Sequence, residues 1–438
     1  LSKRDGRANR MIRVRSFDTD VLVVGGGPAG LAAAYSAAQG GRRVLLVDEN
    51  PTLGGQIWRG EWMAPRSLEA ASWFDRVRRA RVSLLTGVRI VAEVAEKTLL
   101  GESQDATYEF RYKTMILATG ARERFLPFPG WTLPNVMGAG GLQALVKMGL
   151  PIRGKRVVVA GTGPLLLAVA AYLHAQGAKV LTIAEQASRS QVLSLARTLL
   201  RFPSKAWQAV LLRGQLWRIP YDLECWPISA YGEGSVQGVL LRQGSRTREI
   251  PCDYVACGFH LVPNVELALL LGCELRDGYV RVNEFQETSR ADVFCAGEPV
   301  GLGGVDLALV EGQIAGYAAT GRLDAARALF GRRAHWRRFA SRLNRAFALR
   351  PELKSLPDAR TIICRCEDVP FERLRGYSSW KEAKLQTRCG MGPCQGRICG
   401  PAVEFLFGWT VESHRPPIFP ARVESLMWSP SLEQGGHP

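Results

Sequence analysis

Apolar residues along the chain form a unit of strand, helix and strand that occurs twice. The apolar run 21–24 fits a buried strand, the alanine-rich stretch behind it fits a helix, and a second apolar run ends at Asp48. Residues 156–186 repeat this plan, with a strand, a glycine turn, a helix and a further strand. Strands that alternate with helices are typical of α/β proteins, so the sequence predicts an α/β fold with two such units.

The first glycine turn has the spacing G-x-G-x-x-G of a dinucleotide-binding site. Gly25 permits the tight turn, Gly27 lets the backbone approach a pyrophosphate, and Gly30 lets the helix pack closely on the strand. The helix N-terminus supplies amides for the phosphates, and Asp48, 23 residues after Gly25, can accept hydrogen bonds from an adenosine ribose. The residues expected to bind the cofactor here are Gly25, Gly27, Pro28, Ala29, Gly30, Asp48 and Glu49.

The second glycine turn departs from this pattern. Gly161 and Gly163 are present, but Leu166 stands where the third glycine belongs and should shift the phosphate pocket. Ordinary hydride transfer from NAD(P)H is therefore disfavoured. Glu185 ends the second strand, where an acid favours NAD or ATP over NADP. Two alternatives remain open: the second site binds a nucleotide, or the domain is retained only for its fold and the site is empty.

Five of the ten cysteines lie close together near the end of the chain, at 364, 366, 389, 394 and 399. Thiolates are soft ligands for iron-sulfur clusters, zinc or copper(I), and four of them commonly hold one centre. Amides of the glycine-rich stretch 390–396 would donate hydrogen bonds to sulfur. The other cysteines, Cys225, Cys252, Cys257, Cys273 and Cys295, show no pairing pattern and are expected to be buried apolar residues.

Length, charge and hydropathy limit the number of domains, the kinds of partner and the cellular location that we expect. At 438 residues the chain should hold two or three domains, and no run of about 18 apolar residues predicts a membrane span. The net charge of +17 fits an acidic protein partner, an acidic membrane surface or an ordinary arginine-rich soluble surface, whereas the basic segments 201–218 and 331–350 lack nucleic-acid motifs. Without an export signal, and with Met11 as the expected start, we expect a cytoplasmic protein and leave peripheral association with the inner membrane open.

Three further stretches resemble the two-dinucleotide-binding-domain flavoproteins over residues 11–325. They are "PTLGGQI" (51–57), "MILATGARE" (115–123) and "VFCAGEPVGLGGVDLALVEGQIAG" (293–316). The resemblance implies that the first site binds FAD, or an adenine nucleotide in its place. It adds Gly55 and Gln56 along the flavin, Thr119 and Gly120 beneath the cofactor, and Gly297 and Glu298 near the ribityl and pyrophosphate groups. Glu298 replaces the usual aspartate.

The positions of the cysteines exclude the disulfide reductases of this family. They carry a redox-active cysteine pair near the flavin, and this chain has no cysteine before Cys225.

The cysteine-rich end resembles the bacterioferritin-associated-ferredoxin-like (BFD-like) 2Fe-2S module over residues 360–402. "CRCEDV" and "TRCGMGPCQGRICGP" carry the resemblance. It implies Cys364, Cys366, Cys394 and Cys399 as cluster ligands, with Cys389 as a spare. The pairing of Cys389 with Cys394 is the alternative to Cys394 with Cys399, and spacing alone does not separate a 2Fe-2S cluster from zinc.

As a whole, the chain resembles the alpha subunits of heteromeric FAD-dependent dehydrogenases, such as opine oxidases, hydroxyproline and proline dehydrogenases and hydrogen cyanide synthase. The resemblance implies an oxidoreductase subunit for CH–NH or CH–NH₂ donors. An amino-acid-oxidase-like beta subunit would oxidise the substrate, and this subunit would pass electrons to a quinone or another acceptor. It leaves room for an FMN at a subunit interface and a small gamma subunit.

Rival hypotheses are a self-contained NAD(P)H-dependent flavoprotein and a non-enzymatic metal-handling protein. We assign no catalytic acid or base, since His260, beside a predicted strand end, fits a structural histidine. The predicted domains are 11–135 with 286–330 for FAD, an inserted 136–285, a basic linker helix 331–358, and 359–438 for the cluster and tail.

Overall fold

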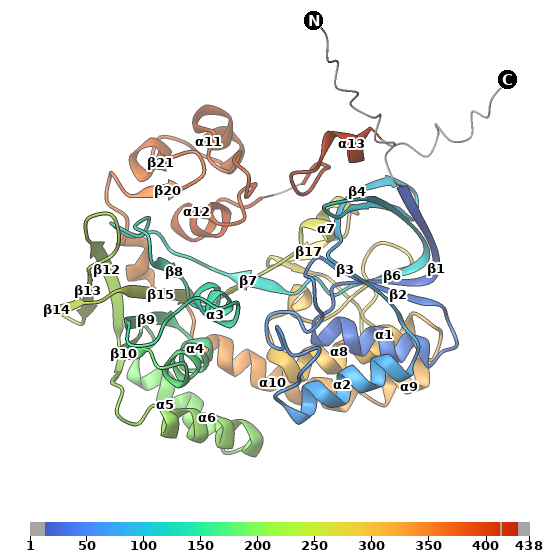
Figure 1. Cartoon of the computed structure of the whole chain (residues 1–438), viewed down its shortest axis with the longest axis horizontal. Helices are drawn as coiled ribbons and strands as arrows, with labels where there is room; N and C mark the ends of the chain where they lie inside the picture. The colour runs from blue at the N-terminus through green and yellow to red at the C-terminus, as the bar shows by residue number, and fades with distance from the viewer. Residues whose placement is uncertain (1–13, 412–413, 428–438) are drawn as a thin grey trace, which may run out of the picture. The chain divides into compact units, whose positions relative to one another are not determined.

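The structure, a computed structural model, describes residues 14–411 and 414–427 (Figure 1). It forms two compact units, and the chain changes unit between Gly120 and Ala121, between Pro263 and Asn264, and between Arg333 and Ala334. The described tail after residue 413 returns to the first unit. The sequence placed 121–135 with the first domain and 264–285 with the second. At two of these changes lie the crossing strands β7 (Ala121–Glu123) and β16 (Leu261–Pro263), which pair antiparallel with each other.

The first unit is built on a seven-stranded sheet. Its strands are β1 (Val14–Val24), β2 (Val44–Asp48), β3 (Ser83–Thr86), β4 (Arg89–Ala95), β5 (Thr98–Glu102), β6 (Thr107–Leu117) and β19 (Val293–Cys295). The order is β3-β2-β1-β6-β5-β4, with β19 beside the end of β6. Strands β3, β2, β1, β6 and β19 pair in parallel, whereas β4 and β5 pair antiparallel. The turns after β1 and β2 therefore lie at the carboxyl edge, where such sheets bind ligands.

Glycines let two helices of this unit approach each other closely. The helices are α1 (Pro28–Ala38), α2 (Leu68–Arg79), α7 (Glu266–Leu270), α8 (Gly304–Ala318), α9 (Leu323–Arg327) and α13 (Val423–Leu426). A Cβ atom on Gly312 of α8 would lie 2.1 Å from the carbonyl oxygen of Ala29 in α1, and one on Gly316 would lie 2.3 Å from that of Ala33. Any larger residue at these two positions would push α8 away from α1.

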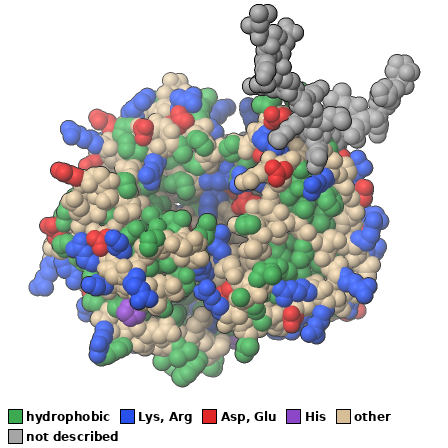
Figure 2. All heavy atoms as spheres, in the orientation of Figure 1, with side chains coloured by type: hydrophobic (Ala, Val, Ile, Leu, Met, Phe, Trp, Pro, Cys, Tyr) green, Lys and Arg blue, Asp and Glu red, His purple; other side chains and the backbone are tan. Residues whose placement is uncertain are grey.

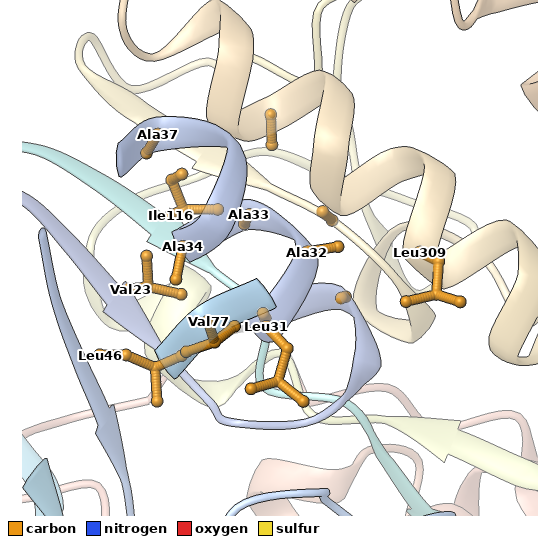
Figure 3. Packing of buried hydrophobic residues seen from close by; sticks show 14 of the residues in the cluster. Val23, Leu31, Ala32, Ala33, Ala34, Ala37, Leu46, Val77, Ile116 and Leu309 are labelled. Carbon is orange, nitrogen blue, oxygen red and sulfur yellow. The ribbon is translucent and has the colours of Figure 1, made fainter. Parts of the chain in front are cut away.

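The core beneath α1 is closely packed. Figure 3 shows Leu31 and Ala34 of α1 beside Val23 of β1 and Leu46 of β2, with Val77 of α2 completing the group. All five side chains are fully or almost fully buried. This packing fixes the start of α1, and with it the first glycine turn.

The second unit contains a five-stranded parallel sheet in the order β11-β10-β9-β15-β8. Its strands are β8 (Val136–Gly138), β9 (Arg156–Thr162), β10 (Lys179–Glu185), β11 (Tyr221–Leu223) and β15 (Tyr254–Phe259), and an antiparallel meander consists of β12 (Cys225–Tyr231), β13 (Gly238–Gln243) and β14 (Arg246–Pro251). The helices are α3 (Ala139–Lys147), α4 (Pro164–Ala175), α5 (Arg189–Leu199) and α6 (Pro203–Gln215). Ser188 and Gln191 form a capping box that begins α5.

The cysteine-rich region also belongs to the second unit. It consists of β20 (Ile362–Cys364), β21 (Val369–Pro370), the 3₁₀ helix η3 (Phe371–Leu374), α11 (Trp380–Thr387) and α12 (Cys399–Phe407). Trp131 donates from its indole nitrogen to the carbonyl oxygen of Ile362 at 2.6 Å, and Arg124 pairs with Glu404 at 3.8 Å. These contacts tie the region to the segment that follows β7.

The predicted basic linker is helix α10 (Phe330–Ala346), which is followed by the 3₁₀ helix η2 (Pro351–Ser355). In the first unit, Arg333 donates to Glu284 and Gln286. In the second unit, α10 packs through Phe339 on Phe202, with ring centroids 5.0 Å apart. The helix is therefore a connecting element that packs on its own chain.

The tail lies along β4 and β6 of the first unit. The amide of Ile418 donates to the carbonyl oxygen of Val91 at 2.8 Å, and the hydroxyl groups of Thr107 and Ser425 are 2.9 Å apart. It contains the short helix α13. Its residues beyond 427, like the proposed start at Met11, lie outside the described residues.

No helix in the described part of the chain is long and apolar enough to cross a membrane. Helix α6 nevertheless exposes apolar side chains: Trp207 is 64% exposed, Val210 60% and Leu211 48%, and Trp217 just beyond the helix is 68% exposed. Figure 2 shows hydrophobic side chains gathered at the lower edge of the molecule, where α6 lies. We call these four residues the α6 stripe.

Candidate functional site

The first glycine turn leaves no room for side chains. Gly25 has a φ of +108°, and a Cβ atom there would lie 2.2 Å from the carbonyl oxygen of Ala118. One on Gly30 would lie 1.7 Å from the carbonyl oxygen of Gly25. Gly27 caps α1 and Pro28 is the first helical residue, so the amides of the first turn of α1 have no acceptor within the helix. This is the arrangement that receives a pyrophosphate.

Asp48 at the end of β2 holds this turn in place. One carboxylate oxygen accepts a hydrogen bond from the amide of Gly26 at 2.5 Å, and the other accepts from the amide and the side chain of Asn50 at 2.7 and 2.8 Å. Burial raises the pKa of Asp48 above its ordinary value. Glu49 instead forms an exposed ion pair with Arg89 at 2.9 Å.

The loop after β2 approaches the turn through two facing glycines. A Cβ atom on Gly55, whose φ is +59°, would lie 2.9 Å from the Cα atom of Gly27. Gln56 follows, and its side-chain oxygen accepts a hydrogen bond from Arg59 at 3.0 Å. Glycine at both positions leaves a cradle of bare backbone beside the start of α1.

Thr119 and Gly120 lie where the chain leaves the first unit. The hydroxyl of Thr119 donates to the carbonyl oxygen of Asn264 at 2.6 Å, and the side chain of Asn264 donates back to the carbonyl oxygen of Thr119 at 2.9 Å. Sequence reasoning missed Asn264. The signal that was available is an asparagine directly after the apolar run 254–263, at a place where the chain must turn.

Gly297 and Glu298 close the site from the side of α8. Gly297 has a φ of +81°, and a Cβ atom there would lie 2.8 Å from that of Ala29. The carboxylate of Glu298 accepts hydrogen bonds from the amides of Gly303 and Gly304 at 3.2 and 3.0 Å. Burial raises the pKa of Glu298 to about 7. Its longer side chain thus reaches the loop that begins α8.

Contacts connect most of the predicted residues around the start of α1. Gly55 faces Gly27, Asp48 binds the turn, Gly25 packs on Ala118 and Gly297 packs on Ala29. The positions that a Cβ atom would obstruct form a cradle of backbone, and this fits a dinucleotide such as FAD. Glu49 and Gln56 make polar contacts elsewhere, with Arg89 and Arg59.

The second glycine turn is built differently. Gly161 resembles Gly25, since a Cβ atom there would lie 2.0 Å from the carbonyl oxygen of Gly258. Gly163 caps α4 with a φ of +98°, whereas Gly27 caps α1 with a φ of −76°. Leu166 is fully buried in the core of this unit. The leucine in place of the third glycine accompanies a turn whose backbone conformation differs from that of the first turn.

Glu185 is fully buried and bound by its own turn. Its carboxylate accepts hydrogen bonds from the amides of Gly163 and Ala187, at 2.7 and 2.8 Å, and from the hydroxyl of Thr162 at 2.7 Å. Burial raises the pKa of Glu185 to about 7. The hydrogen-bonding capacity of this carboxylate is therefore used largely by the protein itself.

Residues Phe347–Arg350 lie over this second turn, and we call them the cover segment. The hydroxyl of Thr162 donates to the carbonyl oxygen of Phe347 at 3.4 Å. The buried side chain of Gln186 donates to the carbonyl oxygen of Ala348 at 3.1 Å and accepts from the amide of Arg350 at 3.1 Å. The chain's own backbone therefore contacts the region where an adenosine ribose would bind. Sequence reasoning had no signal for this contact.

Three buried thiols, those of Cys364, Cys389 and Cys399, lie within 4.8 Å of one another. Cys364 ends β20, Cys399 begins α12 and Cys389 follows α11. The amide of Gly390 donates to the sulfur of Cys364 at 3.4 Å, which is the kind of amide contact expected of this glycine-rich turn. Such contacts stabilise negative charge on sulfur.

Cys366 and Cys394 complete a group of five. Their side chains interact with each other, and that of Cys394 also interacts with that of Cys399. Cys366 is exposed and Cys394 is half-buried. Gly392 leaves room for Cys366, because a Cβ atom there would lie 2.3 Å from the Cβ atom of Cys366.

The thiols share protons unequally. Hydrogen bonds from the thiols of Cys389 and Cys399 lower the pKa of Cys364 to about 2, and a hydrogen bond from Cys399 lowers the pKa of Cys394 to about 5. The pKa of Cys389 is raised to about 12, first because its thiol donates to Cys364. That of Cys399 is also raised, by its contacts with the same neighbours. Thiolates, the form that binds metals, are favoured at Cys364 and Cys394.

A centre with four thiolate ligands fits this group, which offers five. Cys389, which we predicted to be a spare, lies in the tight triplet with Cys364 and Cys399. The set Cys364, Cys366, Cys394 and Cys399 remains the prediction, and Cys389 remains the alternative. Thiolates supported by main-chain amides suit an iron-sulfur cluster.

Comparison with known proteins shows the family to which the chain belongs. Residues 19–313 match the family model described as pyridine nucleotide-disulphide oxidoreductase. Over 420 residues, the chain is 31% identical to HcnB, the hydrogen cyanide synthase component of Pseudomonas protegens, a match that covers 86% of this chain and 89% of that protein. It is also 31% identical to the A subunit of opine oxidase from Agrobacterium tumefaciens over 430 residues, which cover 88% and 84% of the two chains.

A solved structure shares the fold over nearly the whole chain. The L-proline dehydrogenase from P. horikoshii aligns with a TM-score of 0.65 over 94% of this chain and 80% of its own, at 19% identity. The predicted FAD/NAD-binding Rossmann-like fold is thereby confirmed.

Proposed function

Since the chain belongs to the pyridine nucleotide-disulphide oxidoreductase family, in the group that contains HcnB and its opine oxidase counterpart, we propose that it is the electron-transfer subunit of a heteromeric flavin-dependent dehydrogenase. The complex oxidises an amino or imino acid: hydroxyproline, proline, an opine or glycine. The oxidation removes two electrons and two protons from a CH–NH group, and water then hydrolyses the imine.

One observation supports an electron supply other than NAD(P)H. The cover segment is hydrogen-bonded to Thr162 and Gln186 at the second glycine turn, and Glu185 is fully buried there. A nicotinamide dinucleotide would have to displace this backbone before it could bind. The first glycine cradle and the cysteine group then remain as the sites of electron carriers, so electrons enter from a partner.

The residues of this chain bind and orient two carriers. The turn Gly25–Gly30, with the facing Gly55, would hold FAD, and four of the five clustered cysteines would hold a 2Fe-2S cluster. When bound, FAD accepts two electrons at once whereas the cluster accepts one at a time, so the pair can divide a two-electron oxidation into single steps. Gly390 supports a reduced cluster through its amide contact with sulfur.

The partners follow from what this chain's residues do. His260 is half-buried, and burial lowers its pKa, so it is poorly suited to accept a proton from substrate. Oxidation of the C–N bond is therefore assigned to an amino-acid-oxidase-like beta subunit. An FMN at a subunit interface and a small gamma subunit complete the proposed complex.

A quinone is the proposed final acceptor, and the α6 stripe supports a contact with the membrane that holds it. Residues 186–221 around the stripe contain six lysines and arginines and no acid. Exposed tryptophans flanked by cations are typical of helices that lie in the interface of an anionic bilayer. The protein would thus be cytoplasmic and peripheral to the inner membrane.

Purification of the native complex under anaerobic conditions tests this function. Visible and electron paramagnetic resonance spectra are recorded before and after addition of hydroxyproline, proline, an opine or glycine. We expect one of these substrates to bleach the flavin and to produce the signal of a reduced cluster. NADH should do neither within a turnover. Rapid bleaching of the isolated chain by NADH, or iron and labile sulfide absent from the sample, would overturn the proposal.

A further inference from the structure

Two segments of the second unit carry cations and no acid. Residues 186–221 contain six lysines and arginines, and residues 334–351 contain five arginines, without an aspartate or glutamate in either segment. The first segment includes α5 and the second includes most of α10. Proteins usually intersperse charges of both signs, so such segments call for an anion.

The two segments face each other across a cavity of about 640 Å³ between α5 and α10, within the range of small-ligand sites. One wall consists of four arginines of α10: Arg337, Arg338, Arg342 and Arg345. The other wall presents polar side chains of α5, among them Ser194 and Thr198. None of the described residues that line this arginine cavity is acidic, and the second glycine turn does not contribute to the lining.

The walls of the arginine cavity are held at a fixed separation. Arg342 donates to the hydroxyl of Thr198 at 3.2 Å, which bridges the two helices directly. Beyond the end of α5, the ring of Phe202 packs on Phe339 and Trp336, with centroids 5.0 and 6.2 Å apart. A ligand would therefore meet a preorganised site, which lowers the entropic cost of binding.

Part of the charge in this cavity is not neutralised by the protein. Arg338 and Arg345 make no hydrogen bond or ion pair with any described residue, and both are exposed. Like charges on one helix face destabilise each other, and an anion between them would relieve that repulsion. The planar fork of a guanidinium matches the oxygens of a phosphate, and the hydroxyl of Ser194 on the opposite wall adds a donor.

We propose that the arginine cavity binds an oligophosphate group, meaning two or more linked phosphates, which is carried by a nucleotide or by an inorganic chain. The row from Arg337 to Arg345 extends roughly 12 Å along the helix, so a single phosphate or carboxylate reaches only part of it. Because α10 leads through Ala346 directly into the cover segment, an oligophosphate on this helix also holds the cover in place.

Isothermal titration of the full-length protein, saturated with FAD, tests the proposal with tripolyphosphate as the probe. The wild-type chain should bind it at physiological salt. The variant Arg338→Gln/Arg345→Gln should bind about a hundredfold more weakly, at about tenfold for each charge-assisted contact removed. The matched control is Arg201→Gln/Arg218→Gln, which removes the same charge from exposed positions outside the cavity and should bind like the wild type. Flavin content and circular dichroism report on folding of both variants.

Titrations with other ligands identify the molecule that carries the phosphates. ATP that binds more tightly than tripolyphosphate assigns the rest of the cavity to a nucleoside, whereas equal affinities assign the site to the phosphate chain alone, and either outcome supports the proposal. It is overturned if the wild-type chain does not bind tripolyphosphate, or if the two double variants weaken binding equally. An oligoglutamate peptide that binds more tightly than both phosphate ligands would overturn it as well.

Discussion

At the scale of single residues, the acids at the two strand ends bind their own glycine turns. Asp48 accepts a hydrogen bond from the amide of Gly26, and Glu185 accepts one from the amide of Gly163. The sequence predicted a ribose contact for each acid, but it did not reveal that the protein itself supplies donors to both. A buried acid in such a position stabilises the turn, and a cofactor can use only the hydrogen-bond acceptor sites that the turn leaves unoccupied.

Protonation of Glu185 should make folding stability depend on pH. Burial raises its pKa from 4.5 to about 7, so the folded chain binds more protons than the unfolded chain between these values. Its contribution to stability is therefore lost as pH rises from about 4.5 to about 7, by up to about 3 kcal/mol. Denaturant midpoints at pH 5, 6, 7 and 8 should vary less in Glu185→Gln than in the wild type. Parallel pH profiles in the two proteins would contradict this.

Substitution of Gly30 should empty the first site. In Gly30→Ala the new Cβ atom would lie 1.7 Å from the carbonyl oxygen of Gly25, so the turn must open, at about 1–3 kcal/mol. We expect at least a tenfold loss of FAD affinity, which flavin release on dilution can measure. Gly141→Ala is the matched control, because Gly141 also lies in a helix but has open space around it. Full flavin retention in Gly30→Ala would contradict the cradle.

Three cysteine variants can decide the ligand set. Cys364 belongs to the predicted ligands and to the tight triplet, so Cys364→Ser should abolish the reduced-cluster signal and leave flavin content unchanged. Cys389→Ser should retain both iron and the signal if Cys389 is a spare. Electron paramagnetic resonance and iron analysis measure each outcome. Loss of the cluster in Cys389→Ser with retention in Cys399→Ser would replace Cys399 by Cys389 as a ligand.

At the scale of elements, short sequence patterns predicted those helices and turns whose contacts lie within the same stretch of chain. The G-x-G-x-x-G spacing places α1 and its turn correctly, because each glycine meets an obstruction within its own unit of strand and helix. The capping box at Ser188 and Gln191 is likewise a short-range signal. Gly312 and Gly316 were not singled out, since their requirement for glycine arises from α1, nearly 300 residues away in sequence.

The α6 stripe predicts binding to anionic membranes. Trp207, Val210 and Leu211 lie at helical spacing on one exposed face, and apolar burial with basic flanks favours a negatively charged bilayer. Replacement of these three residues by serine should lower co-sedimentation with phosphatidylglycerol-containing vesicles at least tenfold. Neutral vesicles should bind the wild type weakly. The variant removes no buried side chain of α6, so its folding should be preserved, and equal sedimentation of both proteins would exclude this role.

At the scale of the whole molecule, the sequence predicted both dinucleotide-binding folds and the cysteine-rich region, but not the closure of the second turn. Gln186 and Ala348 are 162 residues apart and carry no motif that relates them. The leucine at position 166 indicated an altered site, and the cover segment supplies a physical reason for lost access that no local pattern could reveal. The carboxylate of Glu298 likewise reaches Gly303 and Gly304 through a side-chain conformation that spacing does not specify.

The chain passes from one unit to the other four times, the last time as it enters the tail that lies along β4 and β6. A single proteolytic cut at any one passage therefore cannot release a free half, because three covalent connections remain. The tail after residue 413 is therefore not a removable appendage. Its deletion would leave the carbonyl oxygen of Val91 and the hydroxyl of Thr107 without their hydrogen-bond partners Ile418 and Ser425.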